Sequence, residues 1–112
     1  MDIKRDGASS VTVLERQFDE AMMGIYHRAK SECNYTPSIF FDMLTRLRGV
    51  ETAKRLINAS SVSDGYTKLF ELGRLNLTVE AVIHDEVKWH PLFSDAELAI
   101  CKDRLTEYGY LN

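Results

Sequence analysis

Residues 94–110 read Ser-Asp-Ala-Glu-Leu-Ala-Ile-Cys-Lys-Asp-Arg-Leu-Thr-Glu-Tyr-Gly-Tyr and carry the clearest helix signature of the chain. Ser94 and Glu97 have the spacing of a capping box, in which each side chain accepts a hydrogen bond from the other residue's backbone N–H. Gly109 is placed to end the helix, because glycine adopts the left-handed conformation of a Schellman motif at no steric cost. Apolar residues recur between these signals at steps of three and four, as expected for one buried helix face. They are Leu98, Cys101, Leu105 and Tyr108.

The N-terminal part of the chain follows the same pattern. Apolar side chains at steps of three and four predict one long amphipathic helix over about 10–32. Asn34 follows this helix and suits the left-handed position that closes it. A second helix is expected directly afterwards, with Thr36 as its N-cap and Pro37 in its first turn, where the missing N–H has no cost.

Shorter helical segments are predicted in the middle of the chain. Gly49 is expected either to end the second helix or to kink it, and the apolar spacing predicts a further helix over about 50–58. Ser63 or Asp64 can cap the next short helix, and Thr78 can cap the one after it. No stretch alternates apolar and polar residues for long enough to predict a strand.

Together these signals predict an all-α domain. We expect a compact bundle of five to six helices with long first and last helices. The chain has 112 residues, of which 45% are hydrophobic and 28% are charged, so it is long enough for one core and too apolar for disorder. Residues 1–9 are polar, so we expect a flexible N-terminal tail followed by a single domain over 10–112.

The charge of the chain is unevenly distributed. Its 14 basic and 17 acidic side chains give a net charge of −3, whereas proteins that bind phosphate backbones usually carry a basic excess. Residues 46–74 contain six basic and three acidic side chains and are therefore locally +3. This segment is either a solvated helix surface or a basic interaction surface. Its cations are Arg46, Arg48, Lys54, Arg55, Lys68 and Arg74.

The sequence contains no motif for catalysis, metal binding or nucleotide binding. The three histidines form no His-Glu-x-x-His motif, the glycines form no phosphate loop, and the two cysteines lie far apart. We interpret Cys33 and Cys101 as reduced, mostly buried thiols of a cytoplasmic protein. No run approaches the ~20 apolar residues that span a bilayer. We therefore expect no catalytic, cofactor or metal site, no enzymatic activity and no membrane association.

Residues 61–80 have the spacing of two short helices around Gly73 and could form a helix-turn-helix. The second of these helices, however, offers Glu80, Asp85 and Glu86, and carboxylates on a recognition helix repel DNA. The competing interpretation is that this segment caps its helices and fills the core. Nucleic-acid binding is therefore kept as an alternative function.

The only tryptophan, Trp89, lies in an apolar segment at residues 87–93 that is predicted to be a loop. Such a loop either folds back as a lid on the core or presents an aromatic anchor to a partner. The lid is the preferred interpretation.

Four segments of the chain together resemble a group of small stand-alone bacterial helical proteins. The Ser-Asp-Gly-Tyr segment at residues 63–66 and the Gly-Arg-Leu segment at residues 73–75 are the most specific parts of this resemblance. The group has no established activity, so the resemblance implies a bacterial cytosolic protein and identifies no catalytic residue. The segments are Val50–Ile57, Ser63–Thr67, Gly73–Glu80 and Tyr108–Tyr110.

These observations predict a protein–protein interaction module that acts by surface complementarity; the alternative is a nucleic-acid-binding accessory or regulatory protein that uses the basic residues. The segment 46–74 would steer an acidic partner, and Tyr66, Trp89 or exposed methionines would act as anchors. The partner is another protein or a second copy of the chain, and an exposed edge at Met22 and Met23 would favour a homodimer. The candidate interaction residues are Arg46, Arg48, Lys54, Arg55, Tyr66, Lys68, Arg74 and Trp89.

Overall fold

A computed structural model describes residues 11–111 of the chain, and the tail expected at residues 1–9 lies outside this range. The described residues form helices and connecting turns and contain no strand, so the all-α prediction is confirmed. The first and last α-helices are long, with 21 and 13 residues. In chain order the segments are α1 (Val13–Cys33), α2 (Ser38–Ile57), α3 (Asp64–Glu71), the 3-10 helix η2 (Leu75–Leu77), α4 (Val79–Asp85), the 3-10 helix η3 (Val87–Leu92) and α5 (Asp95–Glu107).

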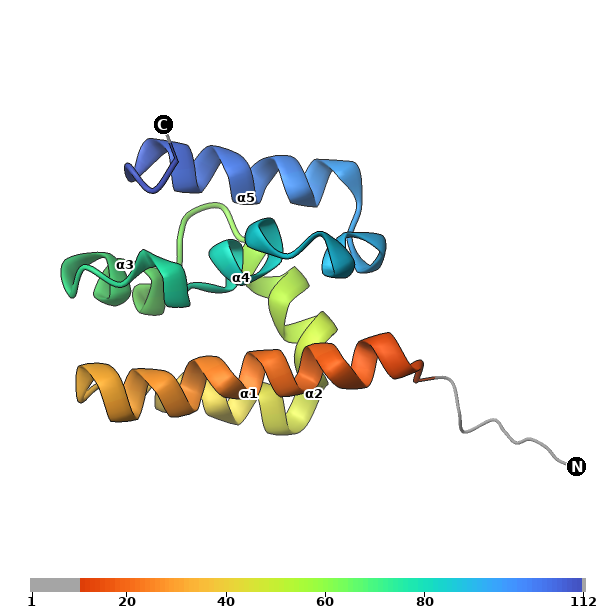
Figure 1. Cartoon of the computed structure of the whole chain (residues 1–112), viewed down its shortest axis with the longest axis horizontal. Coiled ribbons are helices and arrows are strands. Elements are labelled where there is room, and N and C mark those ends of the chain that lie inside the picture. Colours follow the sequence, from red (N-terminus) through yellow and green to blue (C-terminus); the bar gives the residue numbers. More distant parts are fainter. Residues whose placement is uncertain (1–10, 112) are drawn as a thin grey trace, which may run out of the picture.

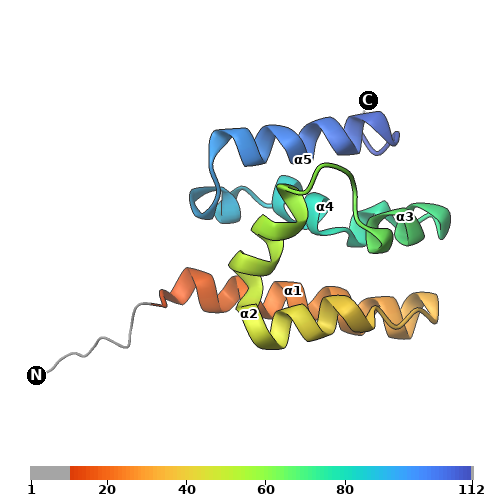
Figure 2. The same cartoon turned by 180° about the vertical axis from the view of Figure 1, so that it is seen from behind.

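The helices stack in levels, as Figures 1 and 2 show from opposite sides. At one face of the molecule, α1 and the first half of α2 form an antiparallel hairpin. The level above it contains α3 and α4, and α5 covers α4 at the opposite face. The second half of α2 leaves the hairpin and crosses to the upper levels.

Side-chain caps stabilise the starts of α1, α3, α4 and α5. Ser94 and Glu97 form the predicted capping box at the start of α5. Ser63 caps α3 and Thr78 caps α4, in each case through a side-chain oxygen that accepts a backbone N–H of the first turn. Gly109 follows α5 with φ 85°, the left-handed conformation that was predicted for it. The sequence was sufficient to predict these helix ends, because each of the interactions forms within one helical turn.

The turn between α1 and α2 agrees with one prediction and contradicts another. Asn34 closes α1 in the left-handed region with φ 52°, as predicted. Thr36 does not cap α2, and no side chain among the described residues does so. The N–H of Ser38, the first residue of α2, instead donates to the backbone carbonyl of Thr36 at 2.9 Å. Thr36 therefore contacts the start of α2 through its main chain and not through its side chain.

The break near Gly49 is a kink at which two helical segments meet, and α2 comprises both of them. Arg48 has φ 69° and ψ 179°, a backbone conformation that favours glycine, and the helix continues on both sides of it. The helix predicted over 50–58 corresponds to the second of these segments, which is the second half of α2. The carboxylate of Asp19 on α1 holds the kink, because it accepts the Gly49 N–H at 2.8 Å and the Arg48 Nε at 3.0 Å.

The main core lies between α1, α2, α4, η3 and α5 and contains an aromatic cluster. The Phe18 ring packs edge-on against Trp89 and Phe93, with centroids 5.3 Å and 5.5 Å away. Residues 87–93 therefore fold back as a lid, the preferred interpretation, and Trp89 at 4% exposure cannot serve as a surface anchor. Met22 is fully buried and Met23 is half-buried against the core, so the two methionines do not form the exposed edge that was predicted to favour a homodimer.

Candidate functional site

A partly enclosed pocket of about 400 Å³ lies between the first half of α2 and α3. This volume is in the range of about 300–1,000 Å³ that is typical of ligand-binding clefts. Residues of α1 and of the start of α4 complete its walls, which are mainly apolar. Among the apolar lining residues are Ile25, Phe40, Met43, Leu56, Leu69 and Val79.

The kink of α2 helps to position this pocket. The first half of α2 stays beside α1, whereas the second half turns towards α5, and α3 lies opposite the hairpin (Figures 1 and 2). The absence of a side chain at Gly49 suits the kink, because a Cβ there would lie 3.0 Å from Asp19 Oδ1 and 3.1 Å from Phe18 Cδ2. The close approach of α1 and α2 at Gly49 therefore helps to orient the α1–α2 hairpin, which forms one wall of the pocket.

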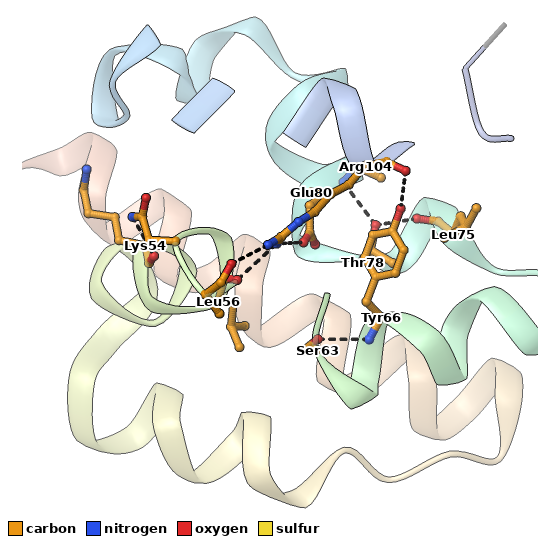
Figure 3. Close-up of polar contacts among 11 residues, drawn as sticks. Lys54, Leu56, Ser63, Tyr66, Leu75, Thr78, Glu80 and Arg104 are labelled. Carbon is orange, nitrogen blue, oxygen red and sulfur yellow. Dashed lines mark hydrogen bonds and ion pairs between the residues drawn. The ribbon is translucent and has the colours of Figure 1, made fainter. Parts of the chain in front are cut away.

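Glu80, a residue of the pocket lining, forms a buried ion pair with Arg104, which Figure 3 shows. Glu80 lines the pocket with 3% of its surface exposed, and its Oε2 accepts the Nη1 of Arg104 at 2.9 Å. The guanidinium of Arg104 also donates to the backbone carbonyls of Leu56 at 3.1 Å and Ala59 at 2.8 Å. Burial raises the pKa of the Glu80 carboxyl, and the hydrogen bond and charge of Arg104 oppose that shift. This side of the pocket is tied to both α5 and the end of α2.

Two further polar side chains of the wall already have partners. The Tyr66 hydroxyl donates to the backbone carbonyl of Arg104 at 3.0 Å, and burial raises its pKa. The Thr78 hydroxyl donates to the Leu75 carbonyl at 2.7 Å and accepts the Ala81 N–H at 3.1 Å (Figure 3). Tyr66 is 2% exposed and lines the pocket, so it is a wall residue and not the surface anchor that was predicted.

The polar groups with spare hydrogen-bonding capacity gather where α3 begins. The Tyr35 Oη lies 3.6 Å from the position that a Cβ on Gly65 would occupy, and the Ser63 Oγ lies 3.8 Å from it. Asp64 is exposed beside them and also lines the pocket. Burial raises the pKa of the Tyr35 hydroxyl, and the charge of Asp64 adds to that shift. Hydroxyl and carboxylate groups therefore share one side of an otherwise apolar pocket.

The predicted basic surface is largely neutralised in the described part of the chain. Five of its six cations lie within 4.0 Å of a carboxylate, and the sixth, Lys68, is exposed on α3. The structure therefore does not gather the six into one free positive surface. The pairs are Arg46–Asp42, Arg48–Asp19, Lys54–Glu97, Arg55–Glu51 and Arg74–Glu32.

The thiols and histidines lie outside the pocket lining. Cys101 is 1% exposed, and burial raises the pKa of its thiol to about 12, so it stays protonated at neutral pH. The half-buried Cys33 accepts the Nη1 of Arg74 at 3.7 Å. The Nε2 of His90 lies 3.0 Å from the Ile83 carbonyl oxygen. Within residues 11–111 no group of three or more potential ligands could hold a metal ion.

Apart from Tyr66, the residues that line this pocket were not among the interaction residues predicted from the sequence. Glu80 was considered only as a carboxylate that would repel DNA, but it is buried against Arg104. One signal was present: Arg104 follows Cys101 by three residues and therefore lies on the apolar face of its own helix. A charged residue in that position needs a buried partner of opposite sign. Asp64 was considered only as a helix cap.

Comparisons of the chain with protein-family models, with curated proteins and with solved structures give no match. The resemblance to small bacterial helical proteins therefore stays a prediction. None of the described helices is long and apolar enough to cross a lipid bilayer.

Proposed function

We propose that this chain is a non-catalytic protein-interaction module, which receives an apolar side chain of a partner protein in the pocket between α2 and α3. The pocket is the observation that carries this proposal. It has room for a large side chain, and its lining is mainly apolar. Burial of one Leu, Ile or Phe side chain contributes about 1.5–3 kcal/mol, which is the contribution expected of an interface hot spot.

The rim of the pocket supports the same proposal. Ile39 lines the pocket, yet 79% of its surface is exposed, the largest value for a large apolar side chain among the described residues. An apolar rim beside an apolar pocket forms a continuous surface that a partner can cover.

The ion pairs of the basic segment favour protein binding over nucleic-acid binding. A phosphate that contacts Arg46, Lys54 or Arg55 would meet a carboxylate that already lies 2.7–3.0 Å from the cation. Salt-dependent affinity for nucleic acid relies on cations that are free to release their counterions. The same pairs weaken the expectation that this segment steers an acidic partner.

We also propose that the protein acts in the bacterial cytoplasm. The resemblance to small bacterial proteins supports the source, and the free Cys33 and Cys101 agree with a reducing compartment.

A peptide library tests the proposed function. Displayed random peptides are selected on the wild-type protein and then measured against Ala29→Met, which adds a longer side chain to a buried residue of the pocket lining. The matched control is Val87→Met, an exposed position on η3 outside the pocket lining. We expect selected peptides to carry a large apolar residue and to lose at least about tenfold in affinity on Ala29→Met alone, since tenfold corresponds to ~1.4 kcal/mol.

Folding of each variant is checked by thermal unfolding and by amide NMR spectra. If Ala29→Met does not fold, Met43→Trp fills the pocket from α2 instead. A library that yields no peptide whose affinity depends on the pocket contradicts the proposal. Peptides that bind Ala29→Met and wild type equally well also contradict it.

A further inference from the structure

The charged residues that line the pocket have one sign. Among the described residues, Asp64 and Glu80 are the only charged members of the lining, and both are acidic. The carboxylate of Glu80 is paired with Arg104 in the interior, which compensates its charge. The uncompensated charge of the pocket therefore belongs to Asp64.

Asp64 lies in the first turn of α3, exposed to solvent. Within residues 11–111, no lysine, arginine or histidine nitrogen comes within 4.0 Å of its carboxylate. Lys68, one turn further along α3, also lies beyond this distance. The neighbouring hydroxyls of Tyr35 and Ser63 add oxygen acceptors on the same side of the pocket. Ammonium and guanidinium groups are the donors that such a group of oxygens binds best.

We infer that the pocket binds a peptide segment in which a large apolar residue is flanked by lysine or arginine. This inference rests on the proposed function and adds the chemistry of the partner. The apolar residue fills the space between α2 and α3, and a flanking cation reaches Asp64 at the start of α3. The partner is therefore basic, opposite in sign to the acidic partner that the composition of residues 46–74 suggested.

The test uses three fluorescein-labelled peptides of equal length. Each has one central phenylalanine, flanked on both sides by two lysines, two glutamines or two glutamates. Affinities are measured by fluorescence anisotropy at low and high salt. We expect the lysine peptide to bind about fivefold more tightly than the glutamine peptide, the glutamate peptide to bind most weakly, and high salt to reduce these differences.

A matched pair of variants assigns the preference to its carboxylate. Asp64→Asn should bring the lysine and glutamine peptides to within about twofold of each other. The control is Asp95→Asn, because Asp95 has the same place at the start of α5, after a capping serine, and lies outside the pocket lining. It changes the net charge equally and should keep the full lysine preference.

The outcomes separate this inference from the proposed function. Equal binding of the lysine and glutamine peptides, or tighter binding of the glutamate peptide, overturns the inference, while loss of binding on Ala29→Met would still support the pocket as the site. An equal effect of Asp95→Asn also overturns it. If no peptide depends on the pocket, the proposed function fails and the inference with it. A dimer in sedimentation that competes with the peptides would assign the pocket to a second copy of the chain and overturn the basic partner.

Discussion

The two halves of α2 pack against the rest of the domain in different ways. The second half is tied to α5 by polar side chains: the Lys54 Nζ and the Asn58 Nδ2 both donate to Glu97, at 2.7 Å and 2.8 Å. The first half faces α3 across a pocket of about 400 Å³ and leaves Ile39 in solvent. The domain is therefore well packed where the second half of α2 meets α5, which is its closed side. Where the first half of α2 faces α3, its open side, it leaves apolar surface exposed. We place function on the side that is not closed.

The two buried glutamates show how strongly the closed side is tied together. Burial alone would raise the pKa of both. At Glu97 the Lys54 ammonium and the Ser94 N–H outweigh burial and lower the pKa to about 2. At Glu80 burial dominates and the pKa is raised, although Arg104 donates to it. Depth of burial and number of donors therefore decide the direction of each shift.

The largest expected loss of stability comes from breaking the buried ion pair between Glu80 and Arg104. Arg104→Met leaves the carboxylate of Glu80 without its cation in the interior and leaves two carbonyls without their donor. Removal of one partner of a buried pair costs about 3–5 kcal/mol in the free energy of unfolding. Urea denaturation of the variant measures this loss.

The matched control for this prediction is the double variant Arg104→Met with Glu80→Leu. Replacing both charges by apolar side chains of similar size is often close to neutral, so most of the stability should return. If the double variant is no more stable than the single one, the uncompensated charge is not the cause.

Low pH should weaken the contact between α2 and α5 that the Glu97 carboxylate makes. The folded pKa of Glu97, about 2, lies below its ordinary value of 4.5, so the folded state favours the ionised carboxylate. Its contribution to stability is complete above pH 4.5 and is lost as the pH falls towards 2. We expect a loss on the order of 2–3 kcal/mol over this window.

The measurement is urea denaturation of wild type and Glu97→Gln between pH 7 and pH 2.5. The stability difference between the two should be largest at pH 7 and should shrink with falling pH, because the wild type alone loses the ionised group. A constant difference across this range would contradict the assigned role of Glu97. The contribution of Glu80 to stability depends on pH in the opposite direction, because its pKa is raised in the fold.

The features that the sequence predicted are those decided within one helical turn. The capping box of Ser94 and Glu97 and the left-handed Asn34 are examples, because each depends on residues that are close in the chain. The conformation of the kink at Arg48 could not be predicted from local sequence, because Asp19, 29 residues earlier, stabilises it. Apolar periodicity predicts which faces are buried, but it does not predict where two buried faces stay apart.

The pocket residues show the same limit. Asp64 was predicted as a possible helix cap, but its place beside Tyr35 follows from the packing of α3 against the turn before α2. The pair of Glu80 and Arg104 joins residues 24 positions apart. Pairs of this kind require knowledge of which helices are neighbours, and the local pattern does not contain it.

A smaller effect is expected at the contact between α1 and α2. Gly49→Ala places a Cβ 3.0 Å from Asp19 Oδ1 and 3.1 Å from Phe18 Cδ2, and the Asp19 backbone is also close, at 3.3 Å. We expect a loss of about 1–2 kcal/mol in the free energy of unfolding, the cost of moderate overpacking. The control is Gly24→Ala, since nothing lies within 4 Å of its Cβ. Gly24→Ala should raise the stability by up to about 1 kcal/mol, so changes of the same sign in both variants would contradict the packing argument.

The smallest effect on stability, and the sharpest test of the open side, is expected at its rim. Ile39 is 79% exposed, so Ile39→Ser should change the free energy of unfolding by less than about 0.5 kcal/mol. It should nevertheless weaken pocket-dependent peptides about tenfold, because a partner that fills the pocket also covers its rim. Val87→Ser is the control, since Val87 is almost equally exposed at 74% but lies on η3 outside the pocket lining, and it should change neither quantity. Peptide affinities that Ile39→Ser leaves unchanged would mean that the bound segment contacts only the interior of the pocket, whereas an equal loss from Val87→Ser would place the binding surface elsewhere.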